Sequence, residues 1–395
     1  YAADDGHAWL LLRRGFDLEV LAVDASTGVT ESIPLIGEPR NVPDEMVADG
    51  RGGVWVSGLR RRQGTLTWMD PTGGSHIVEV ERRHVVTDLS TGRDGEVQAA
   101  LRTWRASPHS PLVLLELEAG EVRRRVEVLP DVPATLLSGR VASVPDGEIA
   151  FGTWEPVGLG SGAAGFWVAR IQDGVQTSFT SLPFAELDHA LAFLGERREA
   201  RVDERLERKR QRGRDPRLRW NVLLHDPVPT PSGWVLVGEA YYPVTRTEQR
   251  VVTVPDGRGG VMTRVTTVQV FVGWAVSHAV VVGFDTEGRR IWDHSVRLGG
   301  IGPTLEEHVR VLESNGAVTL LYPNPQRVLQ RAVLSGGELV VDEEDLRPDT
   351  TAAVRRNRAA DAVWWHDDVF LLYGVDRLER DEGNGRTVFF LTTLE

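Results

Sequence analysis

The sequence contains no cysteine among its 395 residues. Disulfide bonds, thiol nucleophiles and cysteine-ligated metals are therefore excluded, while the redox compartment stays open. Lysine is almost absent as well: Lys209 is the only lysine, and arginine supplies the rest of the positive charge. No apolar run approaches the ~20 residues of a membrane span, so we predict a protein that does not span a membrane.

Positive charge is also in deficit, since the formal net charge is -12. Nucleic-acid binding relies on a positive surface, so nucleic acid is not the expected partner. The ten histidines never fall at H-x-x-x-H or H-E-x-x-H spacing. The acidic run Asp342–Asp345 lacks the alternating oxygen ligands and glycine of a calcium loop, so we interpret it as a solvated acidic turn. We predict no metal and no cofactor.

Two turn signals recur along the chain. The first, a residue such as Asp, Ser or Asn before glycine and then an apolar strand, occurs at Asp5-Gly6, Gly52-Gly53, Asp94-Gly95, Asp146-Gly147, Ser232-Gly233 and Asn315-Gly316, with Asp367-Asp368 as a variant. The second follows an apolar run and occurs at residues 24–28, 70–73, 118–120, 172–174, 285–288 and 335–337. Glycine and Asx residues are favoured there because tight hairpin turns need positive φ.

Two hairpin turns in each unit imply about four short strands, and most units recur every 42 to 52 residues. Four-stranded units at that period are typical of a β-propeller. Two longer spacings border the fifth unit, and removing one insertion from each restores the period. We therefore predict an all-β fold, a seven-bladed β-propeller of four-stranded antiparallel blades forming one domain over residues 1–395.

The first insertion covers residues 182–218. Phe184, Leu187, Leu191 and Leu194 recur at helical spacing, and a charged run over residues 196–214 follows. Glu204 and Arg208 are suited to an i,i+4 ion pair. The charged run is either a solvated helix or disordered linker, or an electrostatic docking site for an acidic partner.

The second insertion covers residues 244–272. Residues 244–254 and 261–272 alternate β-branched with polar residues on either side of a turn over residues 255–260. This pattern predicts a two-stranded arm whose limbs each reach about 35 Å. The valines near its tip are too many for a hairpin surrounded only by water.

The two ends of the chain do not decide how the ring of the propeller closes. Residues 389–394 form a third strand of the seventh unit with no fourth, and only residues 1–5 precede the first turn. One outer strand is either missing or supplied by a partner through strand or arm exchange.

With these repeats laid out, the chain resembles the β-propeller superfamily along nearly its whole length. The stretch from Gly283 to Asp293, with Asp285, Gly288 and Trp292, is similar to the quinoprotein-type repeat, and Val23 to Gly28 matches its first half. The resemblance implies that Trp292 docks neighbouring blades. Only Trp292 takes that position, so no quinone cofactor is implied. Segments 238–243 and 277–285 also resemble uncharacterised exported bacterial propeller proteins.

Three patterns carry candidate chemistry. Gly160 to Gly165 satisfies G-x-G-x-x-G, but a strand follows where a helix is needed, so we interpret it as a hairpin loop. Ser277-His278 and Asp293-His294-Ser295 contain hydrolase residue types, yet neighbours on a strand point to opposite faces, which favours ordinary strand residues. Glu239, Tyr241 and Tyr242 form either a polar and aromatic patch at the base of the arm or packing that holds the arm to its blade.

The irregular segments favour a non-enzymatic scaffold subunit that contacts other protein subunits, because ordering an arm and a charged excursion is unfavourable unless they bind something. The candidate partner-binding residues are Val251, Val252, Val254, Arg258, Val261, Met262, Arg264, Arg205, Arg208 and Arg212. The alternative is an enzyme or small-ligand binder, of quinone or carbohydrate type, that uses the central channel.

We also expect export to the periplasm, the medium or the cell surface. The chain starts at Tyr1 with no signal-peptide apolar segment, as a processed exported protein would, although an arbitrary starting point would look the same.

Overall fold

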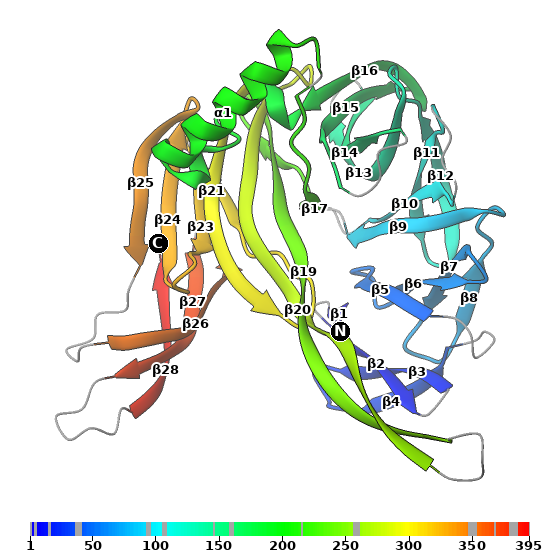
Figure 1. Cartoon of the computed structure of the whole chain (residues 1–395). Helices are drawn as coiled ribbons and strands as arrows, with labels where there is room; N and C mark the ends of the chain where they lie inside the picture. Colours follow the sequence, from blue (N-terminus) through cyan, green and yellow to red (C-terminus); the bar gives the residue numbers. More distant parts are fainter. Residues whose placement is uncertain are drawn as a thin grey trace. The chain divides into compact units, whose positions relative to one another are not determined.

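The computed structural model describes residues 2–3, 6–14, 17–35, 42–91, 96–104, 109–144, 147–157, 162–214, 216–255, 261–346, 354–366, 369–378 and 386–394. It forms two compact units. Unit 1 comprises residues 1–187, 215–219 and 285–289, and unit 2 comprises residues 188–214, 220–284 and 290–395. Seven antiparallel sheets follow one another along the chain and match an all-β propeller (Figure 1).

Unit 1 contains the first four sheets, each with its strands in chain order. They are β1 (Ala2–Ala3), β2 (His7–Arg14), β3 (Asp17–Asp24) and β4 (Thr30–Pro34); β5 (Val42–Ala48), β6 (Val54–Arg60), β7 (Gln63–Met69) and β8 (Ser75–Val78); β9 (His84–Thr91), β10 (Val97–Thr103), β11 (Leu112–Glu118) and β12 (Glu121–Val128); and β13 (Ala134–Val144), β14 (Gly147–Pro156), β15 (Gly165–Gln172) and β16 (Val175–Pro183). The repeating four-strand unit predicted from the turn signals is confirmed here.

Unit 2 contains the last three sheets. They are β17 (Asn221–Leu224) and β18 (Val228–Thr230), which both pair with β19 (Gly233–Pro255), followed by β20 (Val261–Asp285) and β21 (Arg290–Gly302); β22 (Arg310–Ser314), β23 (Ala317–Pro323), β24 (Leu329–Ser335) and β25 (Glu338–Leu346); and β26 (Val354–His366), β27 (Val369–Leu378) and β28 (Arg386–Leu394). The seventh sheet thus has three strands among the described residues, as residues 389–394 predicted.

Aspartate side chains close several of the predicted turns. The Oδ1 atom of Asp24 accepts backbone N–H bonds from Ser26 (2.8 Å) and Thr27 (2.9 Å). The Ser26 hydroxyl bonds the same oxygen and, with these N–H groups, lowers the pKa of Asp24 to about 2. The side chains of Asp49, Asp70, Asp285 and Asn324 close their turns by accepting the backbone N–H groups two and four residues later. An Asx residue is thus selected because its side chain replaces a backbone acceptor.

The turn glycines between third and fourth strands serve a second purpose, which is contact with the preceding sheet. Gly120 has φ +88°, and an added Cβ would lie 3.0 Å from His76 of the second sheet. Gly337 has φ +90°, and an added Cβ would lie 2.5 Å from Cβ of Trp292 in the fifth sheet. These two glycines therefore combine a left-handed backbone with a close approach that excludes a side chain. Trp292 does dock against a neighbouring sheet, as the quinoprotein-like repeat implies.

Each core cluster is shared by consecutive sheets. In unit 1, Trp9 and Val20 of the first sheet pack with Val54 and Met69 of the second, and the same arrangement repeats between the second and third and between the third and fourth sheets. In unit 2 the fifth sheet packs on the sixth, and the sixth on the seventh. Face-to-face burial of successive sheets is the packing expected of propeller blades.

The two insertions are present, and one differs from its predicted form. Phe184, Leu187, Leu191 and Leu194 were expected to form one helical stripe, and this is wrong: β16 ends at Pro183, and two short 3-10 helices, η1 (Phe184–Glu186) and η2 (Ala192–Leu194), follow. Leu187, with φ -75° and ψ 141°, is extended and interrupts the expected helix within the stripe. The charged run then forms helix α1 (Glu196–Gln211).

Other predictions meet mixed outcomes. Residues 342–345 are not a solvated turn but part of β25, where Glu344 pairs with Arg331 and Asp345 accepts a bond from Gln330 of β24. The predicted turns at Asp94-Gly95 and Asp367-Asp368, and residues 160–161 of the glycine-rich loop, lie outside the described residues. No helix in the described part of the chain is long and apolar enough to cross a membrane.

We predict that Asp49→Ala destabilises unit 1 more than Asp24→Ala. Asp49 is 4% exposed and also accepts the Trp68 indole N–H at 2.9 Å, so its removal leaves buried donors unpaired, at a cost of about 3 kcal/mol. The Asp24 turn is exposed, and water replaces the lost acceptor. Guanidinium denaturation followed by far-UV circular dichroism measures both losses; equal losses would contradict this assignment.

Candidate functional site

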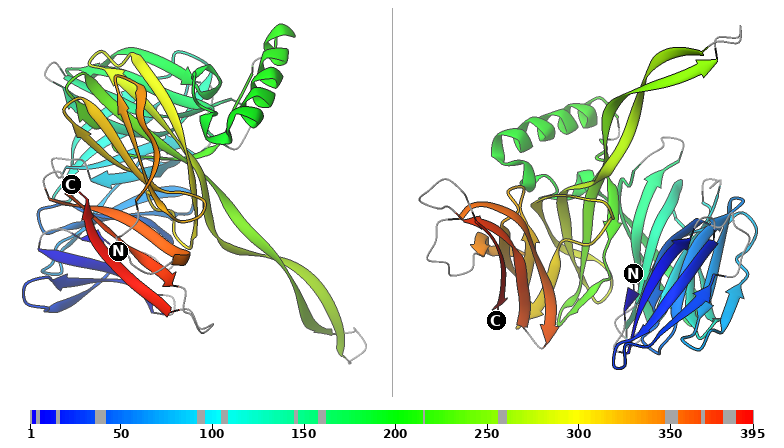
Figure 2. Two further views of the ribbon diagram at one scale, coloured as in Figure 1. Left: turned by 90° about the vertical axis from the view of Figure 1, so that its left-hand side faces the viewer. Right: turned by 90° about the horizontal axis from the view of Figure 1, so that it is seen from below.

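The arm is a two-stranded continuation of the fifth sheet. β17 pairs with β19 as far as Tyr241, and β21 pairs with β20 from Trp274 onward, so the described residues beyond these points pair only with one another. Gln269 Nε2 donates to Thr247 Oγ1 at 2.9 Å, and the Thr266 hydroxyl donates to the Arg250 carbonyl at 3.2 Å. Figure 2 shows the result, a twisted ribbon that projects from its own sheet.

The surface of the arm mixes exposed apolar and charged side chains. Val251 and Val265 are 67% and 59% exposed, and Phe271 near the base is 49% exposed. Arg246 Nε donates to Glu248 at 2.8 Å, and this hydrogen bond lowers the pKa of Glu248. Exposed valines and a phenylalanine on a ribbon without a covering layer are unusual for a surface in contact only with water.

The predicted tip residues fall partly within this description. Val251, Val252 and Arg264 lie on the arm with exposed side chains. Val254, Val261 and Met262 lie in β19 and β20, but their side chains fall outside what the structure describes, as does the whole of Arg258. The arm is therefore confirmed as an element, and partner contact by these residues stays a prediction.

The other predicted residues lie on helix α1, with Arg212 as its C-cap residue. Arg205, Arg208 and Arg212 are exposed, and spacings of three and four place them along one side of the helix. The i,i+4 pair is confirmed, with Arg208 Nη2 at 3.4 Å from Glu204 Oε1. Acidic residues in the first turn and basic residues in the last complement the helix dipole, and buried Leu206 anchors the opposite side.

Asp293 and Ser295 on β21 fasten the segment that precedes α1. The carboxylate of Asp293 accepts the N–H groups of Asp188 at 3.1 Å and His189 at 2.7 Å. The Ser295 hydroxyl donates to the His189 carbonyl at 2.7 Å and accepts the Phe193 N–H at 3.2 Å. Both side chains are buried, so these two hydrolase-type residues tether the excursion to the sheet that carries the arm.

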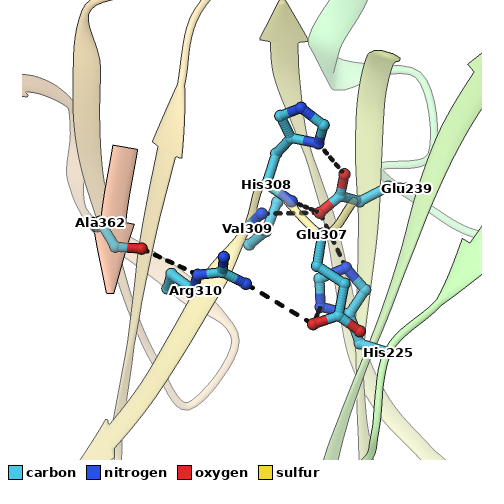
Figure 3. Close-up of polar contacts among 7 residues, drawn as sticks. All are labelled: His225, Glu239, Glu307, His308, Val309, Arg310 and Ala362. Carbon is cyan, nitrogen blue, oxygen red and sulfur yellow. Dashed lines mark hydrogen bonds and ion pairs between the residues drawn. The ribbon is translucent and has the colours of Figure 1, made fainter. Parts of the chain in front are cut away.

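Glu239 does not form an exposed patch, and that interpretation is corrected. Its side chain is fully buried just below the arm and joins the fifth sheet to the segment entering the sixth (Figure 3). Its Oε1 atom accepts the N–H groups of His308 at 2.6 Å and Val309 at 2.7 Å, and lies 2.8 Å from His225 Nε2. His308 Nδ1 lies 3.2 Å from Oε2.

The cluster continues toward the seventh sheet. Glu307 lies 3.8 Å from His225 Nδ1 and 3.7 Å from an Nη atom of Arg310, whose Nε donates to the Ala362 carbonyl at 3.0 Å. This chain of contacts therefore links β17, β19, β22 and β26 (Figure 3). Sequence patterns missed it because the partners of Glu239 lie about 14 residues before it and 70 after it.

Burial and charge oppose each other in this cluster. Burial alone would raise the pKa of Glu239, but the hydrogen bonds from His225 and His308 outweigh it and hold that pKa well below its usual range. Burial likewise would lower the pKa of His225, but the charge of Glu307 and the bond to Glu239 raise it. The favoured state is a carboxylate beside an imidazolium, a buried ion pair with its hydrogen bonds satisfied.

Ser277 and His278 do touch, contrary to the prediction that they face opposite sides of the strand. Ser277 Oγ lies 2.9 Å from His278 Nδ1, at a point where the pairing of β20 and β21 shifts by one residue. His278 is 2% exposed, stacks on Phe193 with ring centroids 3.7 Å apart, and has its pKa lowered by burial to about 3. Among the described residues its Nε2 atom has no hydrogen-bond partner. The pair therefore lacks the orienting carboxylate of a catalytic triad.

Within the described residues, no three His, Asp or Glu side chains are grouped so that they could hold a metal ion. Tyr241 is half-buried and meets Trp274 edge-on at 5.4 Å between ring centroids, so it packs the base of the arm. Tyr242 is 52% exposed. The packing interpretation thus holds for Tyr241, and Tyr242 remains available at the surface.

No family model and no curated protein matches the sequence. Among solved structures, the Dos1 propeller matches at 8% identity and TM-score 0.46 over 98% of this chain and 84% of that chain. Polysaccharide lyase Uly1 matches at 11% and 0.42 over 99% and 88%. The periplasmic gluconolactonase PpgL of Pseudomonas aeruginosa matches at 14% and 0.33 over 98% and 99%. We draw no conclusion about activity or assembly from these likenesses.

We predict that Glu239→Gln destabilises unit 2 by about 3 kcal/mol near pH 5.5, because it leaves His225 without its buried counter-charge. Because the pKa of Glu239 is lowered on folding, its carboxylate stabilises the folded state at pH values above its ordinary pKa of 4.5. Because the pKa of His225 is raised on folding, its imidazolium stabilises the folded state at pH values below its ordinary pKa of 6.5. The difference in unfolding free energy between Glu239→Gln and wild type should therefore be largest between pH 4.5 and 6.5 and become smaller at lower and at higher pH.

Urea denaturation across pH 3 to 9 measures this profile. Glu307→Gln is the matched control, since Glu307 is 42% exposed and its substitution should have a small effect. A loss in Glu239→Gln that does not vary with pH would show that the charge is unimportant.

We also predict that a fluorophosphonate probe does not label Ser277. Its neighbour His278 has too low a pKa to remove the hydroxyl proton, and the hydroxyl already donates to the Ala240 carbonyl. Mass spectrometry of the treated protein tests this. Labelling that disappears in Ser277→Ala would instead reveal an activated nucleophile.

Proposed function

We propose that this protein is a non-enzymatic β-propeller subunit that binds other protein subunits through its arm, in an exported or cell-surface assembly. The observation that carries the proposal is the arm itself, which displays Val251, Val265 and Phe271 to solvent. A two-stranded hairpin is marginally stable alone, so an arm of this length is better supported when a partner covers it.

Backbone groups support the same proposal. The outer edges of a two-stranded ribbon carry unpaired N–H and C=O groups, which favour pairing with a strand of another chain. Arg246, Arg250 and Arg264 on the described part of the arm, and Arg205, Arg208 and Arg212 on α1, favour a partner whose contact surface is apolar at the centre and acidic at the rim.

The seventh sheet offers a second surface for strand exchange. In the described part of the chain, β28 pairs only with β27, and Phe389 and Leu391 on β28 are 66% and 58% exposed. A strand from a partner or from a second copy fits this edge by β-sheet addition. The export compartment is part of the proposal and rests on the sequence expectation alone.

We predict that shortening the arm abolishes association without unfolding unit 2. Residues 248–268 are replaced by Asn-Gly, because Thr247 and Gln269 lie opposite each other and a two-residue turn closes such a pair. The tagged variant is expressed in the native cells, and its complexes are compared with wild type by pull-down and size-exclusion chromatography. Unchanged association would refute the proposal.

Point variants separate the apolar surface from the fold. Val251→Asp and Val265→Asp place charges on the exposed valines and should weaken partner binding about tenfold or more. Thr267→Asp is the matched control, an exposed polar position on the same strand as Val265. Equal weakening by all three substitutions would indicate a general charge effect rather than an apolar contact.

A further inference from the structure

Unit 2 contains a cavity of about 470 Å³ at the base of the arm. Its walls come from four places: the end of η2 with the first turn of α1, the start of the arm at Tyr242, the strands β20 and β21, and the turn between β23 and β24. A volume in this range is typical of sites for small organic ligands. None of the partner-binding residues considered above lines it.

The cavity lies beside a shift in the pairing of β20 and β21. Val276 pairs with Gly300 and His278 with Arg297, so β21 carries one extra residue between these pairs, opposite Ser277. Gly299 is one of the two β21 residues there, and a Cβ on Gly299 would come 2.2 Å from Pro325 Cα. Glycine is therefore required here for close approach of the two backbones.

The surrounding walls are held in place by hydrogen bonds. The side chain of Asn324 accepts the N–H groups of Gln326 at 2.9 Å and Val328 at 3.0 Å, which shapes the turn that carries Arg327. The tether from Ser295 to Phe193 fixes the opposite wall. The site is thus formed before any ligand arrives, which reduces the entropy lost on binding.

The charged groups lining the cavity are all arginines. Arg198 comes from α1, Arg297 from β21 and Arg327 from the turn after β23, and among the described residues no aspartate or glutamate lines the space although the chain has 57 acidic residues. Arg297 also stabilises the charge of nearby Glu343, and Arg327 has a further contact of its own. Guanidinium groups bind carboxylates and phosphates through paired hydrogen bonds.

The remaining lining is largely apolar. Phe193 and Tyr242 present aromatic rings, and Leu194, Val276 and Ile301 add aliphatic surface. A simple inorganic anion would leave this surface wet, whereas a ligand with an apolar body would cover it. We propose that the cavity binds a small amphipathic anion, with a carboxylate or phosphate held by the arginines and an aromatic or aliphatic body against Phe193 and Tyr242.

The test uses the full-length protein and three matched probes. Isothermal titration calorimetry measures binding of 2-naphthoate, 2-naphthyl phosphate and 2-naphthylmethylammonium at up to about 5 mM. We expect at least one of the two anions to bind and the cation not to bind. The stronger anion then distinguishes a carboxylate ligand from a phosphate ligand.

Variants locate the site. Arg297→Ala and Arg327→Ala should each weaken anion binding about tenfold or more, since each removes a charge-assisted hydrogen bond. Arg201→Ala is the control, an exposed arginine on α1 that does not line the cavity. Tyr242→Ala should weaken binding of the two naphthyl anions and leave the binding of inorganic phosphate unchanged. Far-UV circular dichroism verifies that each variant is folded.

Three results would overturn the proposal: no binding of either anion, equal binding of the cation, or binding that the arginine substitutions leave unchanged. The variant with the shortened arm retains every residue that lines the cavity, so it should still bind the probe. Failure of the arm as a docking element and failure of the cavity as an anion site are thus separate outcomes.

Discussion

Burial of each sheet's apolar face against the next sheet is the constraint on which the rest of this molecule depends. A four-stranded sheet of short strands has too little core of its own, so within each unit the packing is shared between neighbours. Hydrogen bonds from side chains also join successive sheets. In unit 1, the side chain of Gln98 bonds both the N–H and the carbonyl of Val141 in the following sheet. In unit 2, the carboxylate of Glu239 accepts the N–H groups of His308 and Val309 in the segment entering the sixth sheet.

Several of these polar contacts come from the fifth sheet. Asp293 and Ser295 hold the segment before α1, and Glu239 holds the segment entering the sixth sheet. Their common effect is a fixed base for two exposed elements, the arm and α1. A buried charge such as Glu239 adds little net stability over an apolar core, but it specifies one arrangement of its partners, because any other arrangement would leave the charge unpaired.

Local signals in the sequence predicted much of the fold. The turn at Asp24 and the turn at Asp285 were visible because Asx and glycine have local conformational roles, and the arm was visible because alternation continued past the usual strand length. For α1 the charged run left a helix and a disordered linker as alternatives, and the i,i+4 pair of Glu204 and Arg208 was the signal for the helix. The 3-10 segments were not predictable, since the extended residue Leu187 interrupts a stripe whose spacing alone suggests a helix.

The polar sites were largely hidden for a different reason. The carboxylate of Glu239 and the hydroxyl of Ser295 find partners about 70 and 106 residues away, which no local pattern records. The contact between Ser277 and His278 was also hidden, because neighbours on a regular strand are expected to face opposite sides of the sheet. The arginines of the cavity come from three separate elements, so only the folded chain reveals that acidic residues are excluded from among them.

The length of the arm does not depend on how the arm is joined to its sheet. Its limbs continue β19 and β20 past the last residues that β17 and β21 engage, so their length is independent of the sheet below. Adding or removing two residues in each limb would move the tip by about 7 Å while keeping the same side chains on the same face. The arm can therefore change its length in fixed steps without any change to the sheet from which it extends.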